Sequence, residues 1–191
     1  MLQNRYFQFI FICILGVFTF ACIDNAEALK NAKKTVLNIS ETNDKFKRQL
    51  NTMTANYYNL SDAIANENME DIRKSAYATI SNIRQIDINL LNDQQQLNWN
   101  LKSEMIKFSL EEIVKYEDLN EIRINFNDLS NWIQQAITEF GLTNGITYVY
   151  ECNDALENEG GKWLSSNTDA ENPYGKDHSG CGDITEQVKF E

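Results

Sequence analysis

The chain has 191 residues, of which 28 are Asp or Glu and 17 are Lys or Arg, and its formal net charge at pH 7 is −11. A surface of this charge repels nucleic acid and anionic lipid head groups, so the composition argues against nucleic acid as a partner. Once a leader is set aside, the remaining length suits one domain with a substantial hydrophobic core.

The start of the chain is typical of an export signal. Arg5 supplies a positive charge, and residues 6–20 form an apolar run shorter than the roughly 20 residues that a bilayer span requires. The run ends in a Thr-Phe-Ala-Cys sequence at Cys22, which resembles the lipobox where bacterial lipoproteins are cleaved before a Cys that is then acylated. We predict a lipoprotein-type signal peptide over residues 1–21, lipidation of Cys22, and anchoring to a membrane at the periplasmic face of the cell envelope. An ordinary secreted protein and an uncleaved anchor are the alternatives.

The segment after the leader has no strong pattern. Residues 26–39 are compatible with a helix but only weakly amphipathic. We therefore predict that residues 22–42 form a tether or an additional helix that holds the rest of the protein off the membrane.

The central part of the chain is predicted to be helical. Neither Gly nor Pro occurs between Val17 and Phe140, and both residues are strongly disfavoured inside helices. Apolar residues recur there at steps of three and four, as expected for helices with one apolar face. The residues expected to be buried are Phe46, Leu50, Met53, Tyr57, Leu60 and Ile64 in a first helix; Met69, Ile72, Ala76, Ile80, Ile83, Ile86 and Leu90 in a second; Leu97, Leu101, Met105, Phe108 and Ile113 in a third; and Leu119, Ile122, Phe126, Leu129, Ile133, Ala136 and Phe140 in a fourth.

Short polar segments separate these helices. Residues 66–68, 92–93 and 117–118 contain Asn and Asp, whose side chains accept the free amide protons of a first helical turn. Short connections imply antiparallel neighbours. The predicted fold is therefore mainly α: an up-down four-helix bundle within a domain over residues 43–183.

The composition changes after Gly141, which is a natural stop for the fourth helix. Residues 146–150 are β-branched and aromatic, and residues 160–161 and 172–175 have turn chemistry. We predict a C-terminal cap over residues 142–183, made of loops and one or two short strands, followed by a tail over residues 184–191. Trp163 and Tyr174 are expected to hold the cap against the helices.

Four segments of this chain occur in the same order in a known family. They are Tyr58 to Ile64, Tyr148 to Ala155, Gly160 to Ser165, and Asn172 to Gly182. With these segments the chain resembles the periplasmic helical domain of uncharacterised function found beside, or fused to, the membrane-fusion adaptors of copper and heavy-metal efflux systems in Gram-negative bacteria. The resemblance implies an envelope location and a metal-efflux adaptor, or another envelope protein, as the partner.

The family pattern has two Cys and two Met near the C-terminus, which suggests soft-metal chemistry because thiolate and thioether ligands select Cu(I). The corresponding set in this chain is Cys152, Asp154, His178 and Cys181, so both Cys positions are kept and both Met positions are replaced. Imidazole and carboxylate ligands move the expected preference toward Zn(II) or Cu(II). The resemblance therefore implies a copper or zinc site formed by these four residues.

A disulfide is the direct alternative to this metal site. Two Cys in an oxidising compartment form a disulfide by default, and Cys152 and Cys181 would close a loop of roughly 30 residues. The loop-entropy relation assigns such a bond roughly 3.5–4 kcal/mol. His178 would then be a surface or packing residue, and Asp154 a solvated acid.

An enzymatic function is not expected. The sequence contains no nucleophile elbow, phosphate loop or zincin motif, and it has a single His. Two functions remain: a lipid-anchored periplasmic protein that binds a soft or borderline metal through its cap, and a structural or interaction lipoprotein whose cap is held by a disulfide. A family member that keeps the fold without the metal function is a third, because both Met positions are replaced.

Overall fold

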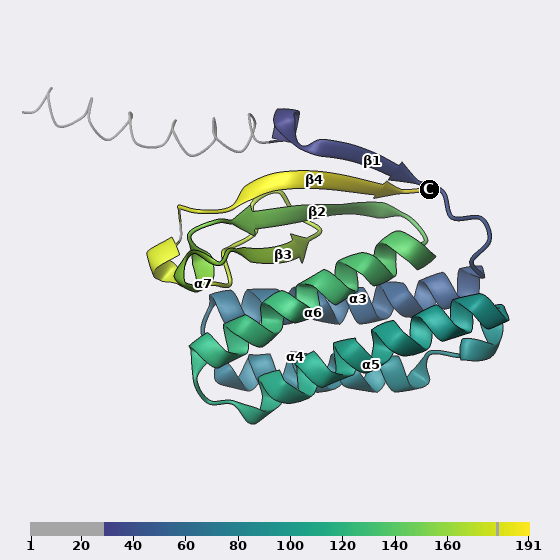
Figure 1. Cartoon of the computed structure of the whole chain (residues 1–191), viewed down its shortest axis with the longest axis horizontal. Helices are drawn as coiled ribbons and strands as arrows, with labels where there is room; N and C mark the ends of the chain where they lie inside the picture. Colours follow the sequence, from purple (N-terminus) through teal and green to yellow (C-terminus); the bar gives the residue numbers. More distant parts are fainter. Residues whose placement is uncertain (1–28, 179) are drawn as a thin grey trace, which may run out of the picture.

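The computed structural model describes residues 29–178 and 180–191, which form a mainly helical protein with a small four-stranded sheet (Figure 1). The predicted signal peptide, the lipidation site Cys22 and the first part of the predicted tether lie outside the described residues. No helix within the described ranges is long and apolar enough to cross a membrane.

Four long helices make up the central part of the protein. They are α3 (Asp44–Ala65), α4 (Met69–Gln85), α5 (Asp93–Lys115) and α6 (Leu119–Phe140). Each helix begins after a residue whose side chain accepts a backbone N–H of the first turn, which confirms the predicted polar breaks; these residues are Asn43, Asn68, Asn92 and Asp118. Consecutive helices run in opposite directions, with α3 packed mainly on α4, α4 on α5 and α5 on α6 (Figure 1).

The sheet joins segments from both ends of the described chain. Its strands are β1 (Lys33–Leu37), β2 (Gly145–Cys152), β3 (Gly161–Ser165) and β4 (Asp183–Phe190), in the spatial order β1-β4-β2-β3. β2 pairs antiparallel with β3 and β4, whereas β1 pairs parallel with β4. The sheet lies along α3 and α6, on the opposite side of these helices from α4 and α5 (Figure 1).

Two predicted boundaries are wrong because of this sheet. The predicted tether or helix over residues 22–42 contains β1, and the predicted tail over residues 184–191 is nearly all of β4, which is a central strand. The predicted cap over residues 142–183 contains two strands, β2 and β3, but they belong to a four-stranded sheet that β1 and β4 complete. β1 was missed because it pairs only with residues about 150 positions further along the chain, and a parallel pair of this kind leaves no local turn signal. β4 was missed because both of its partners, β1 and β2, lie far from it in sequence rather than across a short turn.

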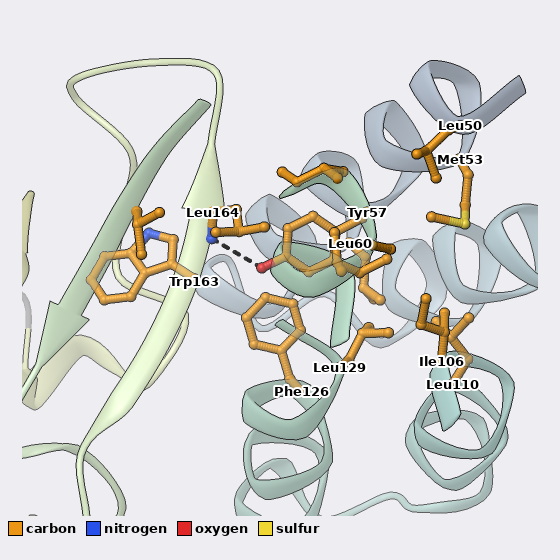
Figure 2. Close-up of a cluster of buried hydrophobic side chains, with 14 of the residues drawn as sticks. Leu50, Met53, Tyr57, Leu60, Ile106, Leu110, Phe126, Leu129, Trp163 and Leu164 are labelled. Carbon is orange, nitrogen blue, oxygen red and sulfur yellow. Dashed lines mark hydrogen bonds between the residues drawn. The ribbon is translucent and has the colours of Figure 1, made fainter. Parts of the chain in front are cut away.

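The core lies between the helices and between the helices and the sheet (Figure 2). All the predicted buried residues of α3 are inaccessible to solvent, and those of the predicted second and fourth helices are buried or partly buried. The second helix is shorter than predicted, however: α4 ends at Gln85, and Leu90 lies in the separate 3-10 turn η1 (Ile88–Leu90). Trp163 of β3 is also buried, and Leu164 brings the sheet against α3 and α6 (Figure 2).

The buried face predicted for α5 is wrong at three of its five positions, whereas Ile113 is buried and Met105 partly buried. Leu97, Leu101 and Phe108 are 65%, 60% and 58% exposed. Trp99, Ile106 and Leu110, which were not predicted, form the core side of α5 together with Ile113. α5 carries apolar residues on two faces, so periodicity alone could not tell which face meets the other helices.

Candidate functional site

The predicted ligand residues Cys152 and Cys181 are joined in a disulfide. Cys152 ends β2, and Cys181 lies two residues before β4, which pairs antiparallel with β2. The Cα atoms of the two residues are 5.2 Å apart, and 29 positions separate them in sequence. The disulfide therefore closes the loop that contains β3 and the residues between β3 and β4.

The other two predicted ligands lie near this disulfide on separate segments. Asp154 precedes the short helix α7 (Ala155–Asn158), and His178 ends the 3-10 turn η2 (Lys176–His178). Both residues and Cys181 line one hollow of about 370 Å³. Cys152 is buried and is not part of this lining.

The hollow is acidic. Its lining also includes Glu151, Asp177 and Asp183. With Asp154 and His178, five of the nine lining residues therefore have a side chain that can carry a charge or bind a metal, and the others are Cys181, Asn153 and two Gly. Across the described part of the chain, however, no three His, Cys, Asp or Glu residues are grouped closely enough to hold a metal ion. A disulfide sulfur is not a thiolate, and the thiolate is the metal ligand. The residues present therefore do not fit a thiolate-bound metal while the disulfide is intact.

Two aromatic side chains hold the cap, as predicted from the sequence. Trp163 stacks on Tyr150 of β2, with ring centroids 4.9 Å apart and planes 13° apart. Tyr174 donates a hydrogen bond to the carbonyl of Lys162 at 2.6 Å and packs near Phe126 of α6. Burial raises the pKa of the Tyr174 phenol well above its ordinary value. These contacts attach the long loop between β3 and β4 to both the sheet and the helices.

The same packing requires glycine at two positions of the cap. A Cβ atom on Gly161 would lie 2.6 Å from the ring of Tyr174, and one on Gly182 would lie 2.6 Å from the ring of Trp163. Non-bonded carbon atoms do not approach one another this closely, so any larger residue would displace an aromatic ring. Gly182 also has a φ of +140°, which L-residues rarely adopt.

Asn172 orders the loop that carries His178 and Cys181. Its side-chain amide donates hydrogen bonds to the backbone carbonyls of both residues, each at 2.8 Å. Its side-chain oxygen accepts from the backbone N–H of Tyr174 at 2.8 Å. The Asn-Pro sequence was recognised as turn chemistry, but these longer contacts could not be derived from it.

Arg123 of α6 connects the cap to the turn between α3 and α4. This largely buried side chain donates from Nε to the carbonyl of Pro173 at 2.9 Å and from its guanidinium to Glu67 Oε1 at 3.0 Å. Glu67 has a φ of +57°, an unusual conformation for a residue other than Gly or Asn. Sequence reasoning missed Arg123, and the only available signal was a basic residue between the buried positions 122 and 126.

A larger hollow of about 630 Å³ is also lined in part by this loop. Tyr150 and Trp163 line it, together with the end of α3, Asp169, Glu171 and the backbone of the loop. Burial raises the pKa of the Tyr150 phenol to about 12. Trp163 Nε1 is buried and has no hydrogen-bond acceptor among residues 29–178 and 180–191.

The comparisons with known proteins concern the helices rather than the cap. No curated protein and no solved structure matches this chain. A match to a family model supports a helical domain of unknown function. This match ends at the start of β2, before Cys152 and all the other predicted ligands. Residues 53–145 match the model of the family described as protein of unknown function (DUF3347).

Proposed function

We propose that this chain is a lipid-anchored, non-enzymatic interaction protein of the bacterial periplasm, whose C-terminal cap is held in shape by the Cys152–Cys181 disulfide. The observation that carries the proposal is this disulfide itself. Disulfides persist in the periplasm and outside the cell and are rare in the cytosol. The export signal and lipobox-like sequence around Cys22 support the same compartment.

The proposal assigns separate roles to the helices and the cap. The four helices act as an up-down four-helix bundle, a rigid base on which the sheet rests. The cap presents a loop whose shape depends on the disulfide, Asn172 and Arg123. A partner protein of the envelope, such as a metal-efflux adaptor, would bind this loop surface.

The contacts of the described residues favour binding over catalysis. Their side-chain hydrogen bonds join helices, strands and loops, and none pairs a Ser, Thr or Cys with His178. A nucleophile next to a base is the usual sign of covalent catalysis. The buried hydroxyl pair of Tyr57 and Ser130 instead links α3 to α6 in the core.

Metal binding by the reduced cap is the second candidate function. It is favoured by one observation: Asp154, His178 and Cys181 line the same acidic hollow. A two-electron reduction of the disulfide would give two thiols, and binding of Zn(II) or copper would release their protons as thiolates coordinate the ion. The metal would then be bound only under reducing conditions.

Thiol trapping and metal titration separate the two candidates. Cells expressing the full chain are treated with an alkylating reagent before and after reduction. The first candidate expects Cys152 and Cys181 to be labelled only after reduction, and the purified protein to bind neither copper nor zinc in either redox state. Sub-micromolar binding of either metal to reduced protein, lost in Cys152→Ser and in His178→Ala but kept in Glu157→Gln, would favour the second candidate. Thiols that are free without reduction would contradict the first.

The lipid anchor has its own test. Cys22→Ala removes the predicted acylation site, so the variant should leave the membrane fraction and appear in the soluble fraction of the envelope. A variant that stays membrane-bound would contradict the acyl anchor.

A further inference from the structure

The two cysteines of the Cys152–Cys181 disulfide are unequally accessible. Cys152 is 1% exposed, although it borders a hollow of about 230 Å³ beside α6. Cys181 is partly exposed and lines two larger hollows of the cap, of about 370 and 630 Å³. A thiolate from solution therefore reaches Cys181 in the folded protein, whereas it reaches Cys152 only when part of the cap opens.

This difference in access decides which sulfur a thiolate attacks. Thiol–disulfide exchange proceeds through a mixed disulfide, and its rate depends on which sulfur is attacked and on access to that sulfur. Attack on Cys181 expels Cys152 as a buried thiolate, which is poorly solvated, so the step is slower than exchange with an exposed disulfide. Attack on Cys152 would expel the better solvated sulfur, but it requires the cap to open first.

The surroundings of Cys181 are negatively charged. The carboxyl groups that line the hollow of about 370 Å³ are those of Glu151, Asp154, Asp177 and Asp183. Lys162 offsets one of these charges, because its Nζ lies 3.2 Å from Glu151 Oε1. With His178 counted as neutral, the lining therefore carries an excess of three negative charges.

The approach through the larger hollow is also acidic. Asp169 and Glu171 line the hollow of about 630 Å³ together with Lys176, whose Nζ lies 4.0 Å from Glu67. A sphere of 370 Å³ is roughly 9 Å across, which is less than the Debye length of about 10 Å at 0.1 M salt. The carboxylates of the smaller hollow therefore act on any charged reagent that enters it. They repel an anionic thiol and attract a cationic one.

We propose that the disulfide exchanges with external thiols through Cys181, at a site that favours positively charged thiols over negatively charged ones. An external thiolate bonds to Cys181 Sγ as the S–S bond breaks, and Cys152 Sγ leaves with the electron pair and takes up a proton. A second thiolate then bonds to the external sulfur of the mixed disulfide and releases the Cys181 thiolate. One disulfide is thereby reduced while two external thiols are oxidised to a disulfide. A protein dithiol with a basic surface around its reactive cysteine has the matching chemistry.

Trapping the first mixed disulfide identifies the attacked sulfur. Protein purified from cells expressing the full chain is mixed with 2-mercaptoethanol, stopped with acid after short times, unfolded, alkylated and analysed by peptide mass spectrometry. We expect 2-mercaptoethanol on Cys181 and the alkyl group on Cys152. The opposite placement, or equal amounts of the two products, would overturn the proposal.

Two variants give the same comparison without reclosure of the disulfide. Cys152→Ser leaves Cys181 as a thiol, and Cys181→Ser leaves Cys152. Each reduced variant reacts with the neutral reagent hydroxyethyl disulfide, and labelling of the remaining cysteine is followed by mass spectrometry, with Trp fluorescence as the check on folding. Cys181 should react about tenfold faster or more, because Cys152 is buried. Equal rates in two folded variants would contradict the proposal.

The charge preference is measured with 2-aminoethanethiol and mercaptoacetate. Each rate constant is expressed per thiolate and divided by the rate of the same thiol with hydroxyethyl disulfide, which removes differences in intrinsic nucleophilicity. At low salt the amine should be favoured about tenfold or more, and the preference should decline as salt screens the carboxylates. A preference that is absent, or that persists unchanged in high salt, would overturn the charge selectivity.

Asp183→Asn should lower this preference about twofold or more, because it removes one carboxylate from the hollow. Asp93→Asn is the matched control: it changes the net charge equally, but Asp93 is an exposed residue at the start of α5 and lines neither hollow. Equal effects of the two variants would mean that the hollow does not select the thiol. The inference rests on the disulfide of the proposed function, and the two fail differently. Thiols that are free without reductant contradict the proposed function, whereas an intact disulfide attacked at Cys152 contradicts only this inference.

Discussion

The phenolic oxygen of Tyr57 accepts a hydrogen bond from the backbone N–H of Leu164 at 3.0 Å (Figure 2). Tyr57 lies on α3 and Leu164 on β3, so this bond joins the helices to the sheet across 107 positions of sequence. The same oxygen lies 2.7 Å from Ser130 Oγ, which itself donates to the carbonyl of Phe126. The Tyr57 hydroxyl therefore donates its proton to Ser130 Oγ. The buried hydroxyls of Tyr57 and Ser130 and the N–H of Leu164 thus all have hydrogen-bond partners.

Tyr57→Phe should lower the free energy of unfolding by about 1–3 kcal/mol, because it leaves the buried Leu164 N–H without an acceptor. Denaturant unfolding of the two proteins measures the difference. Tyr77→Phe is the matched control, because Tyr77 is 57% exposed, and it should leave stability nearly unchanged. Equal effects of the two substitutions would show that the hydrogen bond to Leu164 does not contribute.

Reduction of the Cys152–Cys181 disulfide should lower the free energy of unfolding by roughly 3.5–4 kcal/mol through the entropy gained by the unfolded chain. The loss should be accompanied by faster amide exchange in the loop between β3 and β4, which the disulfide closes. The double variant Cys152→Ser with Cys181→Ser is the control and should not respond to reductant. A wild-type protein whose unfolding is indifferent to reductant would contradict this prediction.

Gly161→Ala should destabilise the protein by about 1–3 kcal/mol, because the added methyl group forces the Tyr174 ring away from its place. Tyr174 has little freedom to move, since its hydroxyl is held by the carbonyl of Lys162. Gly180→Ala is the control, because a Cβ atom at Gly180 meets nothing within 4 Å. Thermal unfolding of both variants checks the prediction, and equal midpoints would be evidence against it.

Asp62→Asn should stabilise the protein at neutral pH. Asp62 is an exposed residue whose carboxyl is nevertheless partly desolvated, which raises its pKa, and the nearby charge of Glu171 raises it further. A carboxyl whose pKa is higher in the folded state binds more protons there, so stability falls as pH rises from about 4, the unfolded value, through the folded pKa. The unfavourable effect is complete above the folded pKa and disappears below about pH 4.

Denaturant unfolding of the wild type and Asp62→Asn as a function of pH tests this sign. The gain from the substitution should be present at pH 7 and shrink toward pH 4. Glu171→Gln should give a smaller gain of the same sign and should add little in the Asp62→Asn background. A gain that is independent of pH would mean that the charge of Asp62 is not the cause.

Much of the helical part could be predicted because its signals are local. The apolar spacing of Phe46 to Ile64 and of Ile122 to Phe140 depends only on the helical repeat, and the Asn and Asp caps act within one turn. The role of Trp163 and Tyr174 also followed from composition, since large aromatic residues between turn sequences need a core to enter. The two Cys were recognised as a pair, with the disulfide as one of two possible states.

The sequence by itself determined the four long helices and their N-terminal capping residues, because these depend on neighbouring residues. Only the tertiary structure decided that β1 and β4 complete the sheet, that Arg123 reaches Glu67 and Pro173, and which apolar face of α5 is buried. Each of these depends on residues far apart in sequence or on a choice between two equally apolar faces. The periodicity of apolar residues predicts the type of one element, but it predicts neither the distant residues that the element contacts nor which of two apolar faces is buried.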